Sequence, residues 1–481
     1  MKKLFLFVLL AALCCSCTES GTDENPDPNG GSNSGQTTPP DPDPDPDPDP
    51  DAKDVIHVPE GGMLAGILNE LGLTEPSSLK LSGTLDMSDF VTLRTILSLK
   101  NLDISRVNLI VLPMNAFYKC ANIKSLVLPN TLTAIDKNAF LQSSLSSITI
   151  PNSVKTIGET AFYGCPFNSI EIPASVETIG KSAFVDCRNL SVLVFAKNSH
   201  LRTIGETAFY GCPFNSIEIP ASVETIGKSA FGNCRNLSVL VFAKNSRLKT
   251  IGETAFTECP FNSIEIPASV ETIEKSAFAY CQNLSVLVFA KNSCLKTIGE
   301  KAFAECPLNS IEIPASVETI EQEAFYNCTS LQTVTFEKGS QLKTIKALVF
   351  DRCSSLTSIE IPASMETITS GAFINCSLQT VTFEKGSKLK TISNGAFSYC
   401  WALTTVDMSA CTQVTEISGS AFSAGPKLQL FKIGTRTPPS FEDRYIGGIY
   451  SYSVLKVPAG CVDAYKKAKG WNEFTTISEL D

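Results

Sequence analysis

Histidine is almost absent from this chain of 481 residues, which contains only His57 and His200. This number excludes His-centred catalysis and metal sites built from several histidines, and we expect both side chains to lie in solvated loops or strands. The sequence also has no glycine-rich phosphate-binding loop and no nucleophile-elbow motif. We therefore predict that the protein is not an enzyme and holds no metal or cofactor.

Surplus positive charge is lacking as well. The net charge is −10, and residues 18–52 alone hold ten acids and no base. Residues 1–17 contribute +2, so the remaining 37 bases and 39 acids leave a body with a charge of −2. A nearly neutral body has no basic stripe to attract phosphates, so nucleic acid is not expected as a partner.

Long hydrophobic runs are missing too, because the apolar run at Leu4–Leu13 is far shorter than the roughly 20 residues that a membrane helix needs. With its basic start and the small residues after it, this run predicts a secretory signal. The ending "LCCSC" resembles a bacterial lipoprotein signal, which is cut before a cysteine that then receives lipid. We place the lipid on Cys17, after the small Ser16, although Cys14 stands where that family usually has an aliphatic residue. Cys15 and plain secretion are the alternatives.

Residues 18–52 end in "PPDPDPDPDPDPD" and cannot form a core. Proline favours an extended chain and the aspartates repel each other, so we predict a disordered tether that reaches roughly 100 Å. Calcium binding by these acids is the alternative to a solvated spacer. A lipid followed by a tether predicts display at the cell surface, on the outer membrane, with contact to the membrane only through the N-terminal anchor.

The rest of the chain is dominated by an internal repeat. The stretch Thr156–Phe184 recurs without change at Thr203–Phe231, and a phenylalanine marks about fourteen units of 22–25 residues. From Phe162 onward a short unit alternates with a long one. These phenylalanines are Phe117, Phe140, Phe162, Phe184, Phe209, Phe231, Phe256, Phe278, Phe303, Phe325, Phe350, Phe373, Phe397 and Phe422.

Within a unit, alternating apolar residues predict one strand with an inward face. In the short unit these are Phe167, Ile170 and Ile172, and Pro173 then ends the strand. The following "ASVETIG" is expected to turn the chain, and "ETAF" to form a brief helical turn that places its phenylalanine in the core. Because one unit cannot bury its own apolar face, the units must stack, with their strands forming a parallel sheet along one side.

The repeated "SIEIPASVETIGKSAF" resembles the BspA-like leucine-rich repeat family. The resemblance implies an α/β-type repeat solenoid with a parallel β-sheet on the concave side and short helical turns on the convex side. We predict the solenoid over residues 109–434, an N-terminal cap over 53–108 and a C-terminal cap over 435–481. The N-terminal cap should contain two short helices and a strand, and the C-terminal cap a strand and a helix. Trp471 is expected to make a capping contact rather than to serve as a ligand platform.

Twelve cysteines lie three residues after the phenylalanine, one in each of twelve units. Parallel side chains on turns about 4.8 Å apart do not bring the Cβ atoms to the roughly 3.8 Å that is typical of a disulfide. We therefore predict a column of free, buried thiols, with no role assigned to Cys294, Cys411 and Cys461. The column is Cys120, Cys165, Cys187, Cys212, Cys234, Cys259, Cys281, Cys306, Cys328, Cys353, Cys376 and Cys400.

The outward strand positions predict a row of side chains on the concave face. Acids on alternate strands should lie about 10 Å apart on a flat surface, which lacks the enclosing pocket that glycoside hydrolysis requires. This row is either a binding surface for an extended partner or a solvated face with strand propensity. The candidate row is Glu171, Val194, Glu218, Val241, Glu265, Val288, Glu312, Thr335 and Glu360.

The family resemblance also implies a function. BspA-like proteins are associated with adhesion to host matrix proteins such as fibronectin and fibrinogen, and with contacts between bacterial cells. We therefore expect an adhesin that binds an extracellular protein ligand. A glycan-binding lipoprotein of a nutrient-uptake system and a purely structural surface component are the alternatives. An exposed aromatic row on the concave face would favour a glycan, and the predicted row contains no aromatic residue.

Overall fold

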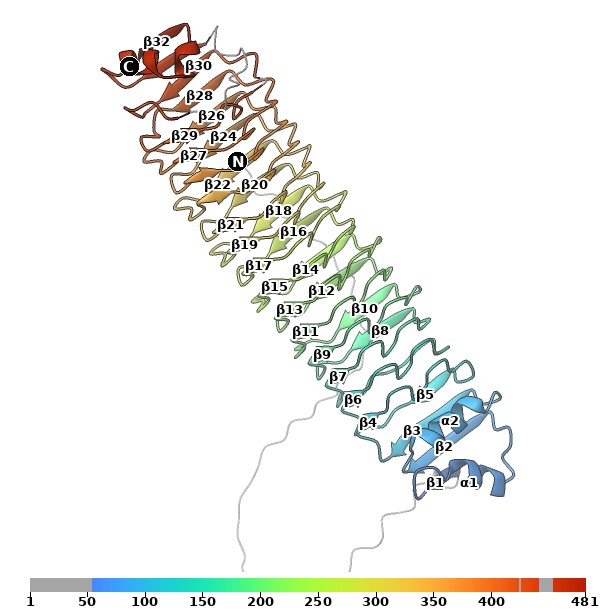
Figure 1. Cartoon of the computed structure of the whole chain (residues 1–481). Helices are drawn as coiled ribbons and strands as arrows, with labels where there is room; N and C mark the ends of the chain where they lie inside the picture. The colour runs from blue at the N-terminus through green and yellow to red at the C-terminus, as the bar shows by residue number, and fades with distance from the viewer. Residues whose placement is uncertain (1–53, 424, 441–452) are drawn as a thin grey trace, which may run out of the picture. The chain divides into compact units, whose positions relative to one another are not determined.

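The computed structural model describes residues 54–423, 425–440 and 453–481. The predicted signal, the lipid site Cys17 and the whole predicted tether lie outside these residues. Lys53–Asp481 form one compact unit, in which strands stack crosswise along a long axis (Figure 1). Among the described residues, no helix is long and apolar enough to cross a membrane.

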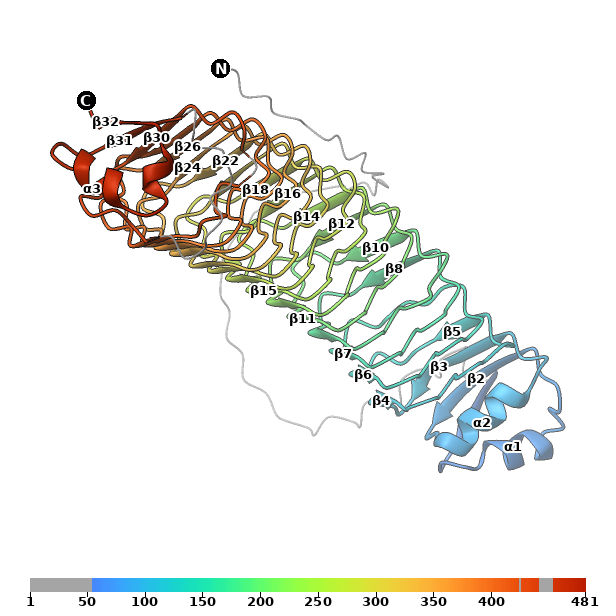
Figure 2. The same ribbon diagram turned by 45° about the horizontal axis from the view of Figure 1, so that its top comes forward.

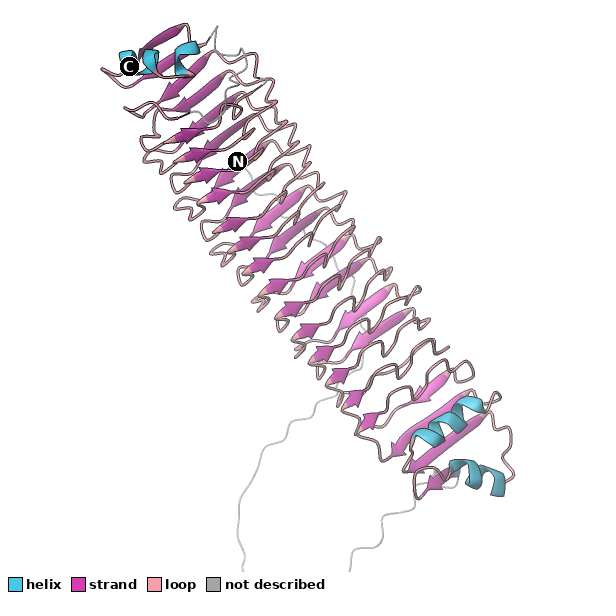
Figure 3. Cartoon of the chain, viewed as in Figure 1, coloured by secondary structure: helices cyan, strands magenta, loops and turns pink. Residues whose placement is uncertain are grey.

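Among the residues that the structure describes, helices lie only at the two ends of this unit (Figure 3). The N-terminal end contains α1 (Leu64–Glu70) and α2 (Met87–Thr95), which pack beside a parallel sheet with the order β1-β2-β3-β5 (Figure 2). These strands are β1 (Val55–Val58), β2 (Ser78–Gly83), β3 (Asn101–Val107) and β5 (Ser125–Val127). The two short helices and the strand between them are confirmed.

At the C-terminal end, β31 (Val454–Val457) and β32 (Thr476–Glu479) extend the sheet of the last repeats, with α3 (Val462–Lys467) and a 3₁₀ turn, η3 (Trp471–Glu473), between them. Trp471 is buried against Phe431 and Tyr465, and its Nε1 donates to the carbonyl of Pro439 at 2.9 Å. The predicted capping contact of Trp471 is thus confirmed.

One side of the solenoid carries four-residue strands, whose alternate residues point inward. Ser169 and Glu171 are exposed, while Ile170 and Ile172, which alternate with them, are buried. This alternation is the period of a half-buried strand. These long strands are β8 (Ser169–Ile172), β10 (Val192–Phe195), β12 (Ser216–Ile219), β14 (Val239–Phe242), β16 (Ser263–Ile266), β18 (Val286–Phe289), β20 (Ser310–Ile313), β22 (Thr333–Phe336), β24 (Ser358–Ile361), β26 (Thr380–Phe383), β28 (Thr405–Met408) and β30 (Leu430–Ile433).

A second side carries a parallel sheet that the sequence analysis did not predict. The segment expected only to turn the chain contains a two-residue strand, and fourteen such strands pair in one unbroken sheet. The buried Ile of each Thr-Ile pair stacks on the next, as in Ile179 on Ile204. The strands are β4 (Val111–Leu112), β6 (Ala134–Ile135), β7 (Thr156–Ile157), β9 (Thr178–Ile179), β11 (Thr203–Ile204), β13 (Thr225–Ile226), β15 (Thr250–Ile251), β17 (Thr272–Ile273), β19 (Thr297–Ile298), β21 (Thr319–Ile320), β23 (Thr344–Ile345), β25 (Thr367–Ile368), β27 (Thr391–Ile392) and β29 (Glu416–Ile417).

The long strands, by contrast, do not form the single sheet that we predicted. They separate into β8–β10, β12–β14, β16–β22 and β24–β32, although all their pairings are parallel. The breaks after β10 and β14 fall where the chain passes from a long unit to a short one. The loop after the strand is longer in the long unit, residues 196–202 against 173–177. This difference weakens the pairing without always abolishing it, because β18 and β20 make the same step and share the single pair Val286 and Ser310.

The third side, around the phenylalanines, consists of tight turns rather than the predicted helical turns. Thr160 has a φ of 53°, in the left-handed region, which interrupts any helix. Alternate N–H groups donate to the next turn instead of within their own: Phe162 N to Ala183 O and Gly164 N to Val185 O, both at 2.8 Å. The backbone is thus satisfied between turns on this side as well.

The core is a continuous column of rings and thiols. From Phe117 to Phe422 successive phenylalanine rings stack with centroids 5.0–5.5 Å apart, and the rings are buried. All twelve column cysteines are buried and free, as predicted. In eleven of them the thiol also donates to the carbonyl of the phenylalanine one turn earlier, at 3.1–3.4 Å, for example Cys165 Sγ to Phe140 O. Burial raises the pKa of Cys165 to about 12.

Candidate functional site

The outward-facing residues of the long strands form one row, which we call the strand row. Parallel pairing sets Glu171 opposite Val194 and Glu218 opposite Val241, so the sequence-predicted residues lie next to one another in register. Further along the solenoid, Glu265 pairs with Val288, Glu312 with Thr335 and Glu360 with Thr382. All nine predicted residues are exposed.

Valines make the strand row partly apolar. In each of three long units two valines face solvent, for example Val192 and Val194 with 49% and 45% of their surface exposed. The other two pairs are Val239 with Val241 and Val286 with Val288, at 45–47%. Short units place serine and glutamate at the same two positions. The row therefore alternates between an apolar and an acidic strand, and both kinds are repeated along the solenoid.

The five glutamates of the strand row have no ion-pair partner among the described residues, unlike a repeated series of glutamates elsewhere on the solenoid. Within the described ranges, Glu171, Glu218, Glu265, Glu312 and Glu360 form no ion pair. Because a carboxylate without a partner still attracts cations, this face can bind positively charged groups of another molecule.

Away from the strand row, lysine and glutamate of neighbouring turns pair with each other. Lys181 Nζ lies 3.0 Å from Glu206, and the same pair recurs one copy later as Lys228 and Glu253 at 2.9 Å. Such exposed pairs contribute little to stability, and they leave those sides close to neutral. The sequence analysis missed this pattern, although the constant 25-residue spacing between the partners signals it.

A cavity of about 510 Å³ lies at the break between β14 and β16. It is lined by β14, by the loop after β14 and by Ser263–Glu265 of β16, so it opens onto the strand row beside Val241. Phe242 at its wall is only partly buried. Lys244, Asn245 and three serines line the cavity together with its apolar residues and Glu265, so it is a mixed recess that can hold a small polar or aliphatic side chain.

The other residues that the sequence analysis named do not lie together in a catalytic or metal-binding site. Cys411 is buried and donates to Ser387 Oγ at 3.4 Å, Cys461 is buried beside α3, and Cys294 is exposed in a loop. Among the residues that the structure describes, no three His, Cys, Asp or Glu side chains come together as a metal site. His57 and His200 lie far apart in sequence, at an exposed strand position and in an exposed loop.

Comparison with known proteins identifies the repeat. A family described as BspA type leucine rich repeat region matches in six copies, over residues 110–238, 202–332 and 318–439, more than half of the chain. A leucine-rich repeat protein from Bacteroides ovatus has 24% identity and a TM-score of 0.56, covering 73% of this chain and 88% of its own. That similarity supports the solenoid fold.

Two other solved structures are more distant. A leucine-rich repeat protein from Eubacterium ventriosum has 22% identity and a TM-score of 0.40, covering 77% of this chain and 93% of its own. The pneumococcal vaccine antigen PcpA has 22% identity and a TM-score of 0.37, covering 65% and 89%. No curated protein matches the chain.

Proposed function

Since the chain belongs to the BspA-type leucine-rich repeat family, we propose that it is a surface-displayed, non-catalytic protein that binds an extracellular protein through its strand row. One observation carries this proposal: the glutamates of the strand row are exposed without ion pairs, whereas a repeated series of glutamates elsewhere on the solenoid pairs with lysine. The expected partner presents basic side chains, separated by apolar ones, along an extended segment. Host matrix proteins such as fibronectin and fibrinogen are the first candidates.

Repetition should determine how such a partner is held. Each pair of turns repeats the same valine and glutamate positions, so every pair contributes a similar small share of the affinity. The cavity at the break between β14 and β16 adds one recess, which can take a small polar or aliphatic side chain of the partner. Affinity should therefore rise with the number of turns, and chain length becomes the adjustable property.

Display at the surface would come from the N-terminus. In this proposal Cys17 carries the lipid and residues 18–52 hold the solenoid away from the outer membrane. Replacing Cys17 by Ala should release the protein from the membrane fraction. Continued retention in the Cys17→Ala variant, followed by release when Cys15 is replaced, would move the anchor to Cys15.

The charge test uses two matched pairs of substitutions. Glu218→Gln with Glu265→Gln removes two carboxylates of the strand row, while Glu224→Gln with Glu271→Gln removes two that pair with Arg202 and Lys249 elsewhere. Binding of residues 53–481 to immobilised fibronectin and fibrinogen is measured at low and high salt. The first variant should bind more weakly and lose part of its salt dependence, and the second should bind like the natural protein. Equal effects of the two variants would contradict the strand-row proposal.

The length test deletes one pair of turns, residues 203–249, whose sequence nearly repeats residues 156–202. The shortened solenoid should still fold, because each turn contacts only its neighbours. Affinity should fall gradually as further pairs are deleted, with folding checked by circular dichroism. All-or-none loss would indicate one local site, and full binding by the isolated ends would place the partner on a cap. A glycan-binding lipoprotein or a purely structural component would bind neither matrix protein in any of these variants.

A further inference from the structure

An exposed aromatic pair breaks the pattern of the turn side. Trp401 is 58% exposed and Tyr399 46%, and their ring centroids lie 6.0 Å apart at an angle of 52°. The preceding turn has Asn375 and Ser377 at the same two positions relative to the cysteine. The other tryptophan of the chain, Trp471, is buried at the C-terminal end. Trp401 thus does not serve the core, and no repeated feature of the solenoid accounts for it.

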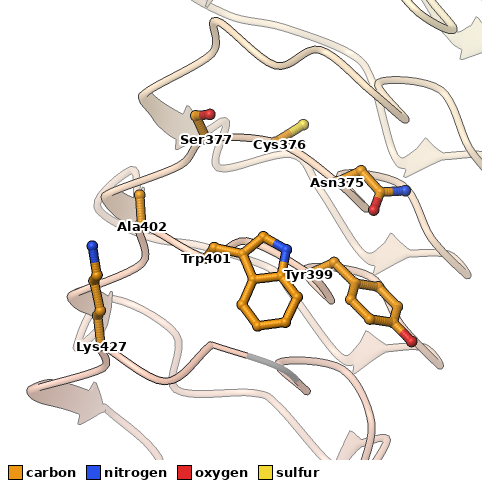
Figure 4. A pocket seen from close by; sticks show the side chains of 7 residues that line it. All are labelled: Asn375, Cys376, Ser377, Tyr399, Trp401, Ala402 and Lys427. Atoms are coloured by element: carbon orange, nitrogen blue, oxygen red, sulfur yellow. The ribbon is translucent and has the colours of Figure 1, made fainter.

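The pair borders a recess of about 330 Å³ (Figure 4). Asn375, Cys376 and Ser377 line it from one turn, Tyr399, Trp401 and Ala402 from the next, and Lys427 from the turn after that. The segment between the cysteine and the next buried leucine is one residue shorter in the first turn, Cys376 to Leu378 against Cys400 to Leu403. Because this turn is shorter, the wall of the recess that it forms beside the indole is lower than the other walls.

Polar side chains lie around the indole, where they could form hydrogen bonds with a small ligand that stacks on it. Figure 4 shows the side chains of Asn375, Ser377 and Lys427 arranged around Trp401 at the centre. Asn375 donates through Nδ2 to the buried Asp351 at 3.0 Å, which fixes its orientation and leaves its amide oxygen as an acceptor. Within the described part of the chain Lys427 forms no ion pair, so its ammonium remains a donor.

The backbone of Tyr399 adds to this picture. Its φ of 57° lies in the left-handed region, which asparagine tolerates, as Asn375 does one turn earlier at 60°. The same conformation recurs directly before the column cysteine in other turns, with residues as different as Glu258 and Arg352. This backbone geometry therefore belongs to the repeat, and it serves here to direct the Tyr399 ring outward beside Trp401.

We propose that this recess binds a pyranose ring of a glycan, with the Trp401 indole as the stacking surface and Tyr399 as its second wall. The negative face of an aromatic ring attracts the polarised C–H bonds on one face of a sugar. The hydroxyls at the sugar edge are then within reach of the Asn375 oxygen, the Ser377 hydroxyl and the Lys427 ammonium. The recess has room for one sugar ring and its linkages, and it is open so that a chain can continue on both sides.

A glycan fits these groups better than a protein does. A protein hot spot needs an aromatic anchor within a ring of contacts that excludes water. Here the neighbours of Trp401 are an amide, a hydroxyl and an ammonium group, which stay hydrated and hydrogen-bond well to sugar hydroxyls. The site is also separate from the strand row, so it does not depend on the function proposed above.

The chain contains a matched recess that lacks the tryptophan. Tyr280 is 43% exposed with a φ of 61°, and it lines a cavity of about 450 Å³ together with Pro260 and Gln282. Gln282 stands where the other recess has Trp401, directly after the column cysteine. The ion pair of Arg235 with Glu258 at 2.9 Å also crosses this second recess. Tyr280→Ala is therefore a control that removes an equally exposed ring from the same kind of place.

The experiment titrates residues 53–481 with three oligosaccharides: chitohexaose, cellohexaose and hexagalacturonate. Because the chain has two tryptophans and Trp471 is buried, the ligand should protect a single accessible indole from acrylamide quenching. Calorimetry gives the affinity independently of fluorescence. Trp401→Ala should weaken binding of at least one oligosaccharide by about tenfold or more, Tyr399→Ala by less, and Tyr280→Ala not at all. Lys427→Ala should weaken hexagalacturonate selectively if the bound sugar is acidic, and should leave neutral sugars nearly unchanged.

Two results would overturn this inference. One is the absence of binding by all three oligosaccharides while circular dichroism shows a folded solenoid. The other is binding that Trp401→Ala leaves intact, since the recess would then not be the site. Because Trp401 is exposed, its loss is not expected to unfold the protein, and a conservative Trp401→Phe variant that keeps part of the affinity separates stacking from any indirect effect.

Discussion

Raising the pH should destabilise this protein through its buried cysteine column. Burial raises the pKa of Cys165, Cys234 and Cys400 to about 12, against an ordinary value of 9.0 that we take for the unfolded chain. Each thiol therefore stays protonated in the folded state while it ionises in the unfolded one. Its contribution to stability is fully present below pH 9 and is lost as the pH rises from about 9 toward 12.

The size of the effect follows from this difference in pKa. Between about pH 8 and pH 9.5, each thiol with such a shift lowers the free energy of unfolding by about 0.8 kcal/mol. The three named thiols together account for about 2.4 kcal/mol, because they lie several turns apart and should act independently. The other column cysteines whose pKa is raised add to the total in the natural protein.

The test compares the natural protein with a triple variant in which Cys165, Cys234 and Cys400 are replaced by Ala. Urea unfolding is followed by circular dichroism at both pH values, with oxygen excluded so that thiolates do not form disulfides. The triple variant should start less stable, because each substitution leaves a small cavity, yet it should lose about 2.4 kcal/mol less between the two pH values. Ionisation of surface lysines affects both proteins equally and cancels in the comparison.

An equal loss in the two proteins would refute the reasoning, since the thiols would then carry no pH-dependent stability. The same conclusion would follow if folded residues 53–481 showed more thiolate absorbance near pH 9 than the single exposed cysteine, Cys294, can supply.

Three further predictions concern the core and the C-terminal cap. Thiol counting should find few reactive cysteines in the folded protein and fourteen more after unfolding without reductant, because Cys411 and Cys461 are buried besides the twelve of the column. Almost no free thiol in the unfolded, unreduced protein would show that the column forms disulfides. Phe256→Ala should lower the free energy of unfolding by about 3–5 kcal/mol, because the buried ring stacks on both neighbours, and urea midpoints should show a much smaller change for the exposed Tyr210→Ala. Trp471→Phe keeps an aromatic ring but loses the hydrogen bond to the Pro439 carbonyl. Amide hydrogen exchange of β31 should therefore accelerate, while the amides of the central turns keep their protection. Faster exchange throughout the solenoid would indicate that the chain unfolds as one unit.

Features set by a simple period could be predicted from the sequence. The strand "SIEI" alternates buried and exposed residues, so the inward isoleucines, the outward glutamates and their register followed from a period of two. The phenylalanine and cysteine columns followed from their constant place in the repeat. For these features each turn repeats the previous one, and a single unit contains the information.

Features that depend on contact between unlike turns could not be predicted in this way. The second sheet rests on two residues per turn, Thr-Ile, which is too short a segment for a strand pattern to be recognised. The breaks between long strands fall between units whose loops differ in length, and the effect of that difference on strand pairing becomes visible only when two units are stacked. The recess at Trp401 depends on a one-residue shortening of the turn before it, so neither turn alone reveals it. The left-handed φ at Thr160 shows why "ETAF" forms a turn, but a threonine at that place gives no such signal in a sequence.

The breaks between the long strands bear on how the solenoid responds to force. The hydrogen bonds between turns run along the long axis of the solenoid (Figure 1). Pulling on the two ends would therefore strain and break them one turn after another. At the junctions after β10, β14 and β22 the long strands do not pair, so the two-residue strands, the turns and the stacked core hold neighbouring units together, and the rupture should begin there. Between the first two junctions the released segment is one copy of the sequence, 47 residues or about 160 Å of extended backbone. In the surface role proposed above, the connection to a partner would lengthen in steps before it is released.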